Sequence, residues 1–174
     1  SVDLNSYYLQ GGYFAENTSV KLIAFAGKEK TYHAWGYATK EQMEKFGRRY
    51  NPCGEMYTDA NGKKYYYDDQ TDNYLQKNYQ LLFNHTFSTA WNLNVALHYT
   101  KGDGYYEEYK DGRYLIEYGL KSFTIDGTEV SKSDLVRQKK MDNKFGGGVF
   151  SLNYTANRLS ASLGGGLNQY RGNN

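Results

Sequence analysis

The stretch that decides the fold is YQLLFNHTFSTAWNLNVALHY, residues 79–99. It reads as two strands joined by the three-residue turn Ser88-Thr89-Ala90, with Phe87 paired with Trp91. Because side chains alternate along a strand, this register gathers one almost wholly apolar face: Tyr79, Leu81, Phe83, His85, Leu93, Val95, Leu97 and Tyr99. The opposite face is mostly polar but uncharged: Gln80, Leu82, Asn84, Thr86, Asn92, Asn94, Ala96 and His98. A slip of one residue would destroy both faces, so the pattern predicts an antiparallel hairpin over about 74–101.

A third hairpin, over about 142–172, follows the same rule. We predict a four-residue turn at 155–158 that pairs Tyr154 with Leu159 and Leu152 with Ala161. In this register the triplets Gly146-Gly147-Gly148 and Gly164-Gly165-Gly166 lie in mid-strand and across from each other, where they indicate a bend or a close approach.

A first hairpin, over about 4–34, turns at Glu16-Asn17 and aligns Tyr13 with Val20. It sorts less cleanly, because the large apolar residues Phe14, Ile23 and Phe25 fall on its otherwise polar face.

Composition supports an all-β class and excludes several others. Of 174 residues, 20 are tyrosine, 19 are glycine and one is proline. The mean hydropathy of −0.84 and the lack of any apolar run near 18 residues exclude membrane-spanning helices. A net charge of +2 with dispersed lysine and arginine gives no reason to propose a nucleic-acid partner. A single cysteine, Cys53, excludes an internal disulfide framework, and no metal-type spacing surrounds it.

Two long segments, about 36–71 and 102–140, separate the hairpins and are expected to be folded in pieces or to face outward. Thr39–Arg48 predicts a short helix with Thr39 as N-cap, and Ser133–Lys140 predicts a second helix opened by Ser133. Two small hairpins are expected at Asp59-Ala60-Asn61-Gly62 and at Asp126-Gly127.

Alternation alone fits a soluble sandwich as well as a membrane barrel. Connections that alternate short and long match periplasmic turns and extracellular loops. Tyr13, Phe87, Trp91 and Tyr154 lie on the apolar face near the tight turns, where amphipathic rings rest at lipid headgroups. These features favour an outer-membrane barrel. A soluble β-rich carbohydrate-binding module is the alternative, and the uncharged polar faces argue against a passive porin.

Candidate ligand-binding residues are the loop tyrosines, whose rings can stack on a planar or sugar-like ligand: Tyr65, Tyr66, Tyr67, Tyr105, Tyr106 and Tyr109. Packing of one loop against another is the competing role for each. The acidic group Asp68, Asp69, Asp72 and Asn73 lacks the glycine and glutamate of a calcium loop and is expected to be solvated.

Catalytic and metal sites are not expected. His33, His85 and His98 are too scattered for a metal site and are assigned structural roles, His85 on the apolar face and His98 on the polar face. No serine, cysteine or carboxylate has a basic partner at motif spacing, so we predict no enzyme activity and no cofactor.

The stretch 74–110, the segment 30–35 and the run 134–143 leading into 145–154 resemble the barrel of TonB-dependent outer-membrane receptors of the Bacteroides group. The resemblance implies that residues 1–174 are a piece of one transmembrane domain: an antiparallel up-and-down meander of about six strands within a 22-stranded barrel, with long, partly structured external loops. It also implies the outer membrane of a Gram-negative bacterium and import of a scarce nutrient such as an iron chelate, vitamin or oligosaccharide.

Partners implied by the resemblance are outer-membrane lipid, a plug domain, the TonB system and a small-molecule ligand. The chain departs from the family by lacking the plug and the TonB-contacting segment, and by carrying Lys140 where the family favours an aromatic residue. Six strands cannot close such a barrel, so we expect the isolated chain to self-associate.

Overall fold

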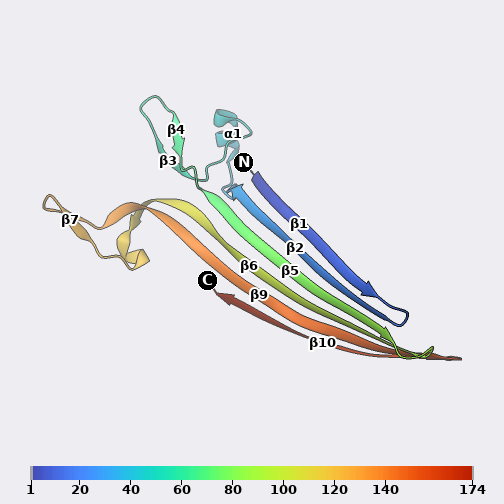
Figure 1. Cartoon of the computed structure of the whole chain (residues 1–174). Coiled ribbons are helices and arrows are strands. Elements are labelled where there is room, and N and C mark those ends of the chain that lie inside the picture. The colour runs from blue at the N-terminus through green and yellow to red at the C-terminus, as the bar shows by residue number, and fades with distance from the viewer. Residues whose placement is uncertain (1, 174) are drawn as a thin grey trace. The chain divides into compact units, whose positions relative to one another are not determined.

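The computed structural model describes residues 2–173, and its long strands form one antiparallel up-and-down sheet. Within that range six strands lie in the order β1-β2-β5-β6-β9-β10 (Figure 1). Their bounds are Val2–Phe14 (β1), Thr18–Tyr32 (β2), Thr71–Thr86 (β5), Trp91–Tyr114 (β6), Lys132–Ala156 (β9) and Leu159–Asn173 (β10). The predicted all-β class and six-stranded meander are confirmed.

The shorter elements occupy the two long connections. They are α1 (Lys40–Phe46), β3 (Glu55–Thr58), β4 (Lys64–Tyr66), the 3-10 helix η1 (Leu115–Tyr118), β7 (Phe123–Ile125) and β8 (Thr128–Val130). Over residues 2–173, no helix has the length and apolar character needed to cross a membrane.

Two compact units divide the chain, and each is described by itself. The hairpin unit comprises residues 4–29, 74–104 and 140–173, and it contains the three tight turns. The loop unit comprises residues 2–3, 30–73 and 105–139, and it contains all the short elements.

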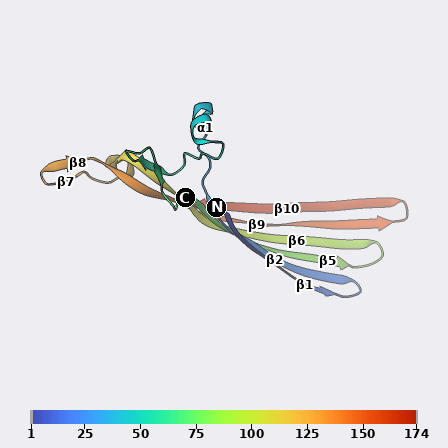
Figure 2. The same cartoon turned by 90° about the horizontal axis from the view of Figure 1, so that it is seen from above.

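The tight turns of the hairpin unit lie at the same end of their strands (Figure 2). Across the first, Ala15 N donates to Thr18 O at 2.8 Å, as the predicted Glu16-Asn17 turn requires. Across the second, Phe87 N donates to Trp91 O at 3.0 Å. The predicted closure of the middle hairpin is therefore confirmed.

Side-chain hydrogen bonds on the polar face of the middle hairpin join residues that the predicted register places opposite each other. Asn84 Nδ2 donates to Asn94 Oδ1 at 2.6 Å, and Thr100 Oγ1 donates to Asn78 Oδ1 at 2.9 Å. Each pair lies across the two strands where the predicted register puts it. On the polar face His98 Nε2 lies 2.9 Å from Asn168 Oδ1, and on the other face His85 Nδ1 lies 2.7 Å from Thr18 Oγ1.

The register predicted for the third hairpin is wrong by two residues. Leu159 pairs with Ala156 and Ala161 with Tyr154, so the turn holds two residues rather than four. Asn157 makes this possible because it adopts a left-handed backbone (φ 51°), which asparagine tolerates better than most residues. Since the error is an even number, every side chain keeps its predicted face.

The same shift corrects the position of the glycine triplets. Gly148 pairs with Leu167, and Gly166 pairs with Val149, so the triplets lie in mid-strand but not across from each other.

In the loop unit, the expected helix at Ser133–Lys140 is wrong, because these residues form part of β9. The expected loop 102–140 is also too long at both ends, since β6 continues to Tyr114 and β9 begins at Lys132. Strand pairing overrides local helix propensity here.

The other local predictions for the loop unit are confirmed. Thr39 caps α1 in a capping box with Gln42, and β3–β4 and β7–β8 are the two expected small hairpins. The second of them turns through Asp126 and Gly127, both left-handed (φ 47° and 78°).

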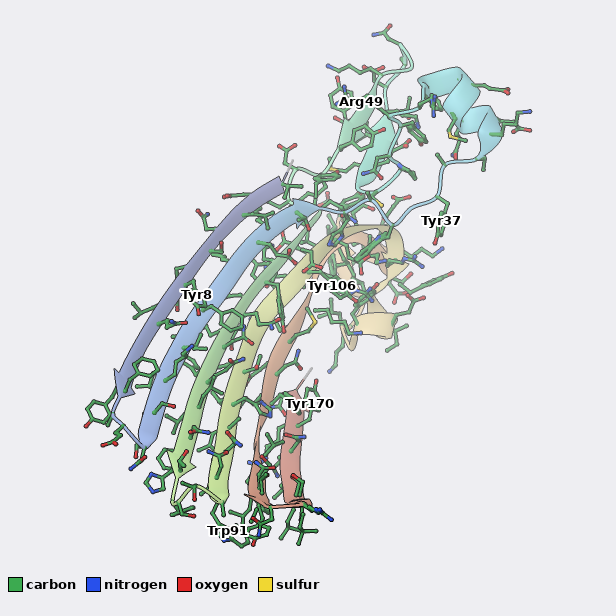
Figure 3. The ribbon with its side chains drawn as sticks, turned by 90° about the vertical axis from the view of Figure 1, so that its right-hand side faces the viewer. Tyr8, Tyr37, Arg49, Trp91, Tyr106 and Tyr170 are labelled. Carbon is green, nitrogen blue, oxygen red and sulfur yellow. The ribbon has the colours of Figure 1, made fainter. Side chains whose placement is uncertain are left out.

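The hairpin unit is a single layer of sheet and has no core of its own. Within its described residues Ala26 is the one buried apolar side chain. Leu9 is 69% exposed and Leu163 is 66% exposed, and side chains stand free along the strands (Figure 3). A sheet of this kind must bury its apolar face against something else.

We predict that Gly147→Ala destabilises the chain by about 1–3 kcal/mol, through overpacking. A Cβ at Gly147 would overlap the backbone oxygen of Leu167 and lie 2.9 Å from Asn168 Cα. Gly11→Ala is the matched control, because a Cβ at Gly11 meets nothing within 4 Å. Urea unfolding in detergent measures both, and equal losses for the two variants would contradict the described packing.

Candidate ligand-binding site

An aromatic group forms where β2 ends and the first long connection begins. The rings of His33 and Trp35 lie 3.7 Å apart, and Tyr106 of β6 meets Trp35 edge-on at 5.5 Å. His33 N donates to Gln70 O at 2.8 Å, and Asn51 Nδ2 donates to His33 O at 2.6 Å. These two bonds to the His33 backbone fix its position. We call His33, Trp35 and Tyr106 the aromatic cluster.

The cluster has a buried side and an open side. His33 is 4% exposed, whereas Trp35 is half exposed and Tyr37, which follows it in the chain, is almost fully exposed. Among the described residues, neither ring nitrogen of His33 has a hydrogen-bond partner. Burial lowers the pKa of His33, and the nearby carboxylates Asp72 and Glu108 only partly oppose this. The ring is therefore neutral at pH 7 and packs as an uncharged aromatic.

Two buried carboxylates, Glu107 and Glu108, lie next to Tyr106 in the chain. Glu108 is buried and accepts hydrogen bonds from Lys110 Nζ at 2.7 Å and Arg137 Nε at 2.9 Å. Burial alone would raise the pKa of Glu108, but these two cations outweigh it and hold the pKa below its ordinary value. Glu107 accepts from the Tyr67 hydroxyl and from Gln138 Nε2. Glu108 is thus paired with two cations, whereas Glu107 is hydrogen-bonded by two neutral groups.

Three of the six predicted tyrosines belong to this region. Tyr106 is part of the aromatic cluster, and the rings of Tyr67 and Tyr109 lie 6.3 Å apart. The hydrogen bond to Glu107 raises the pKa of Tyr67 to about 12. Tyr109 donates to Asp134 Oδ2 at 2.6 Å, and this bond likewise raises its pKa to about 12. The phenol groups of Tyr67 and Tyr109 are committed to structural bonds.

The other three lie elsewhere in the loop unit. Tyr65 stacks on Tyr57 at 4.7 Å across the β3–β4 hairpin. Tyr66 is half-buried on β4, where burial raises its pKa, and Tyr105 is half-buried on β6.

Sequence reasoning missed Trp35, and it gave His33 a structural role without placing its ring in an aromatic cluster. The available signal was the run Tyr32-His33-Ala34-Trp35, which places aromatic rings at a strand end beside a long loop. The pairing of Glu108 with Arg137 left no such signal, because it joins residues 29 positions apart. In the acidic group of residues 68–73, Asp69 forms an ion pair with Lys30 at 3.0 Å. Among the described residues, no group of three potential metal ligands is present.

Comparison of the chain with protein-family models, with curated proteins and with solved structures found no match.

We predict that Asp134→Asn lowers the pKa of Tyr109 from about 12 toward its ordinary value of 10. A raised tyrosine pKa means that the bond stabilises the fold below pH 10, and that this contribution is lost as pH rises through about 12. Ultraviolet titration of phenolate absorbance measures the shift. Asp126→Asn, a carboxylate in the β7–β8 turn, is the control, and a shift of the same size in both variants would contradict the assignment.

Proposed function

We propose that the hairpin unit is a section of the wall of an outer-membrane β-barrel, of the TonB-dependent receptor type that the sequence resembles. The observation that carries the proposal is the uncovered apolar face of a one-layer sheet. In a membrane barrel that face lies against lipid, and the alternating face lines the interior.

The apolar face has the banded pattern that a bilayer requires. At the turn end Trp91 and Tyr154 pack with ring centroids 4.8 Å apart, and Trp91 stands beside the turn in Figure 3. Tyr79 and Tyr99 bound the other side of the band. The nine residues from Trp91 to Tyr99 make eight steps, which span about 26 Å along the strand at roughly 3.3 Å per residue. In a strand tilted by roughly 40° this is about 20 Å along the bilayer normal, of the same order as the roughly 25 Å apolar belt between the aromatic girdles of known barrels.

The polar face suits an interior that holds water or a plug. A chain of amide and hydroxyl groups crosses β5, β6 and β9: Asn84 bonds to Asn94, and Asn94 Nδ2 donates to Ser151 Oγ at 3.3 Å. On β10, Ser162 Oγ donates to Asn153 Oδ1 of β9 at 2.6 Å. Such groups would be costly against lipid, so this face is the inner one in the proposal.

The sheet is open, because β1 and β10 are its two edge strands. We infer that further strands of the same barrel pair with these edges, as a 22-stranded wall of the kind that the resemblance implies would require. An isolated chain would cover its edges by pairing with copies of itself.

In this proposal the loop unit belongs to the external connections and recognises a nutrient ligand. Trp35 offers a half-exposed ring for stacking, while the buried Glu108 nearby is paired with Lys110 and Arg137. An iron chelate, a vitamin and an oligosaccharide all present faces that aromatic rings bind. The role is uptake rather than catalysis.

A soluble carbohydrate-binding module is the second candidate, and the Tyr57–Tyr65 stack on β3–β4 favours it. Such a module would fold without lipid and would keep both tryptophans away from acyl chains.

Lipid contact is tested with the two tryptophans of the chain, Trp35 and Trp91. We predict that lipids brominated on their acyl chains quench Trp91 in the Trp35→Phe variant. The same vesicles leave Trp35 unquenched in the Trp91→Phe variant, because Trp35 belongs to the loop unit. A soluble module would show quenching of neither residue.

A paired substitution tests the two faces. We predict that Leu81→Arg makes folding into vesicles less favourable by about 2–4 kcal/mol, which is the cost of a cation at mid-bilayer. Gln80→Arg adds the same charge one residue away on the polar face and costs much less. Folding efficiency in lipid vesicles is the measurement. Equal effects at the two positions contradict a lipid-facing surface.

A further inference from the structure

A row of four cations crosses the apolar face of the hairpin unit on four consecutive strands of the sheet. Lys144 of β9 pairs directly with Arg171 of β10. Gly146 faces Tyr99, whose ring a Cβ there would meet at 3.2 Å, so Lys144 lies opposite Lys101 of β6. The Asn78–Thr100 bond in turn places Lys77 of β5 opposite Lys101. We call Lys77, Lys101, Lys144 and Arg171 the cation row.

Like charges directly across neighbouring strands repel one another, so the row destabilises the bare sheet. Two carboxylates offset part of this: Asp103 lies 3.2 Å from Lys101, and Asp142 lies 3.4 Å from Lys144. Among the ion pairs of the described residues, none involves Lys77 or Arg171. Four cations and two carboxylates leave an excess of two positive charges, and two cations are free to bind an anion.

The row borders the apolar band directly. On each of β5 and β6 the lysine stands two residues beyond the tyrosine that ends the band, Tyr79 or Tyr99. A shallow hollow of about 610 Å³ lies on the band side of these tyrosines, with Leu9, Leu22, Leu81 and Leu97 in its lining.

A second hollow of about 300 Å³ lies at the β9–β10 end of the cation row. Its lining is Tyr99, Lys144, Gly146, Gln169 and Arg171. Tyr99 lines both hollows, so the apolar and the cationic surfaces are continuous.

We propose that the cation row binds the phosphate groups of anionic membrane lipids, an acyl chain of which lies in the apolar hollow. The inference rests on the proposed wall function, because it places the face in lipid. Free phosphate would not use the apolar hollow, and an apolar chain would not use the cations. An amphiphile with a phosphate headgroup uses both, and the arginine fork and lysine ammonium groups suit phosphate oxygens.

The test measures association of the full chain, by flotation, with vesicles of phosphatidylcholine alone and of phosphatidylcholine mixed with phosphatidylglycerol. The variant is Lys77→Gln/Arg171→Gln, because neither side chain has a carboxylate partner that the change would strand. Each surface cation strengthens binding to an anionic bilayer about fivefold, so the double variant should lose roughly 25-fold of the preference for anionic vesicles.

Two controls match this variant. Lys21→Gln/Arg158→Gln removes the same charge from the hairpin unit at positions off the row, and it keeps the preference. Lys77→Arg/Arg171→Lys keeps the charges and also keeps it.

The outcomes separate the two proposals. Association with both vesicle types and no anionic preference overturns the lipid site and leaves the wall proposal standing. An equal loss in the off-row control also overturns the lipid site, because net charge would then explain the effect. Failure to associate with either vesicle type overturns the wall proposal and the lipid site with it.

Discussion

The constraint on which the rest of the structure depends is that the hairpin unit has two faces and a single layer. Backbone hydrogen bonds between neighbouring strands satisfy the interior of the sheet, but they do nothing for the side chains. On one face Leu9, Leu97 and Leu163 have no protein to pack against. A soluble sheet solves this with a second layer, and a membrane wall solves it with lipid. The polar face needs the opposite solution, which its asparagine and serine hydrogen bonds supply.

The alternation of side chains explains why the sheet could be read from the sequence while its fine register could not. Face assignment depends only on whether a position is odd or even, so it survived the two-residue error in the third hairpin. The partners themselves depend on turn length, and turn length depended on a single residue. Asn157 in a left-handed conformation closes a two-residue turn, and no periodic pattern marks that choice. In the middle hairpin the predicted three-residue turn is confirmed, and the Asn84–Asn94 and Asn78–Thr100 bonds lie where that register puts them.

Prediction of the candidate site was weaker for the same physical reason. Residue type identified tyrosine as the useful ring, but it did not say which rings would meet. Tyr106 joins His33 and Trp35 only because β6 lies near the end of β2 in the loop unit, a contact between residues more than seventy positions apart. Tyr65, chosen for the same chemistry, packs instead against its hairpin neighbour Tyr57. The β9 residues expected to form a helix show how strand pairing overrides a local signal.

The two proposals draw on different chemistry in the two units. In the loop unit the buried carboxylates are matched internally, Glu108 by Lys110 and Arg137, and Glu107 by Tyr67 and Gln138. In the proposed function the half-exposed Trp35 ring of that unit stacks on the ligand, beside Lys139, whose Nζ lies 6.0 Å from the centre of the Tyr106 ring. In the hairpin unit the aromatic rings bound an apolar band, and among the described residues Lys77 and Arg171 form no ion pair. The two proposals therefore use different residues, so binding of a stacking ligand need not weaken binding of a phosphate-bearing lipid.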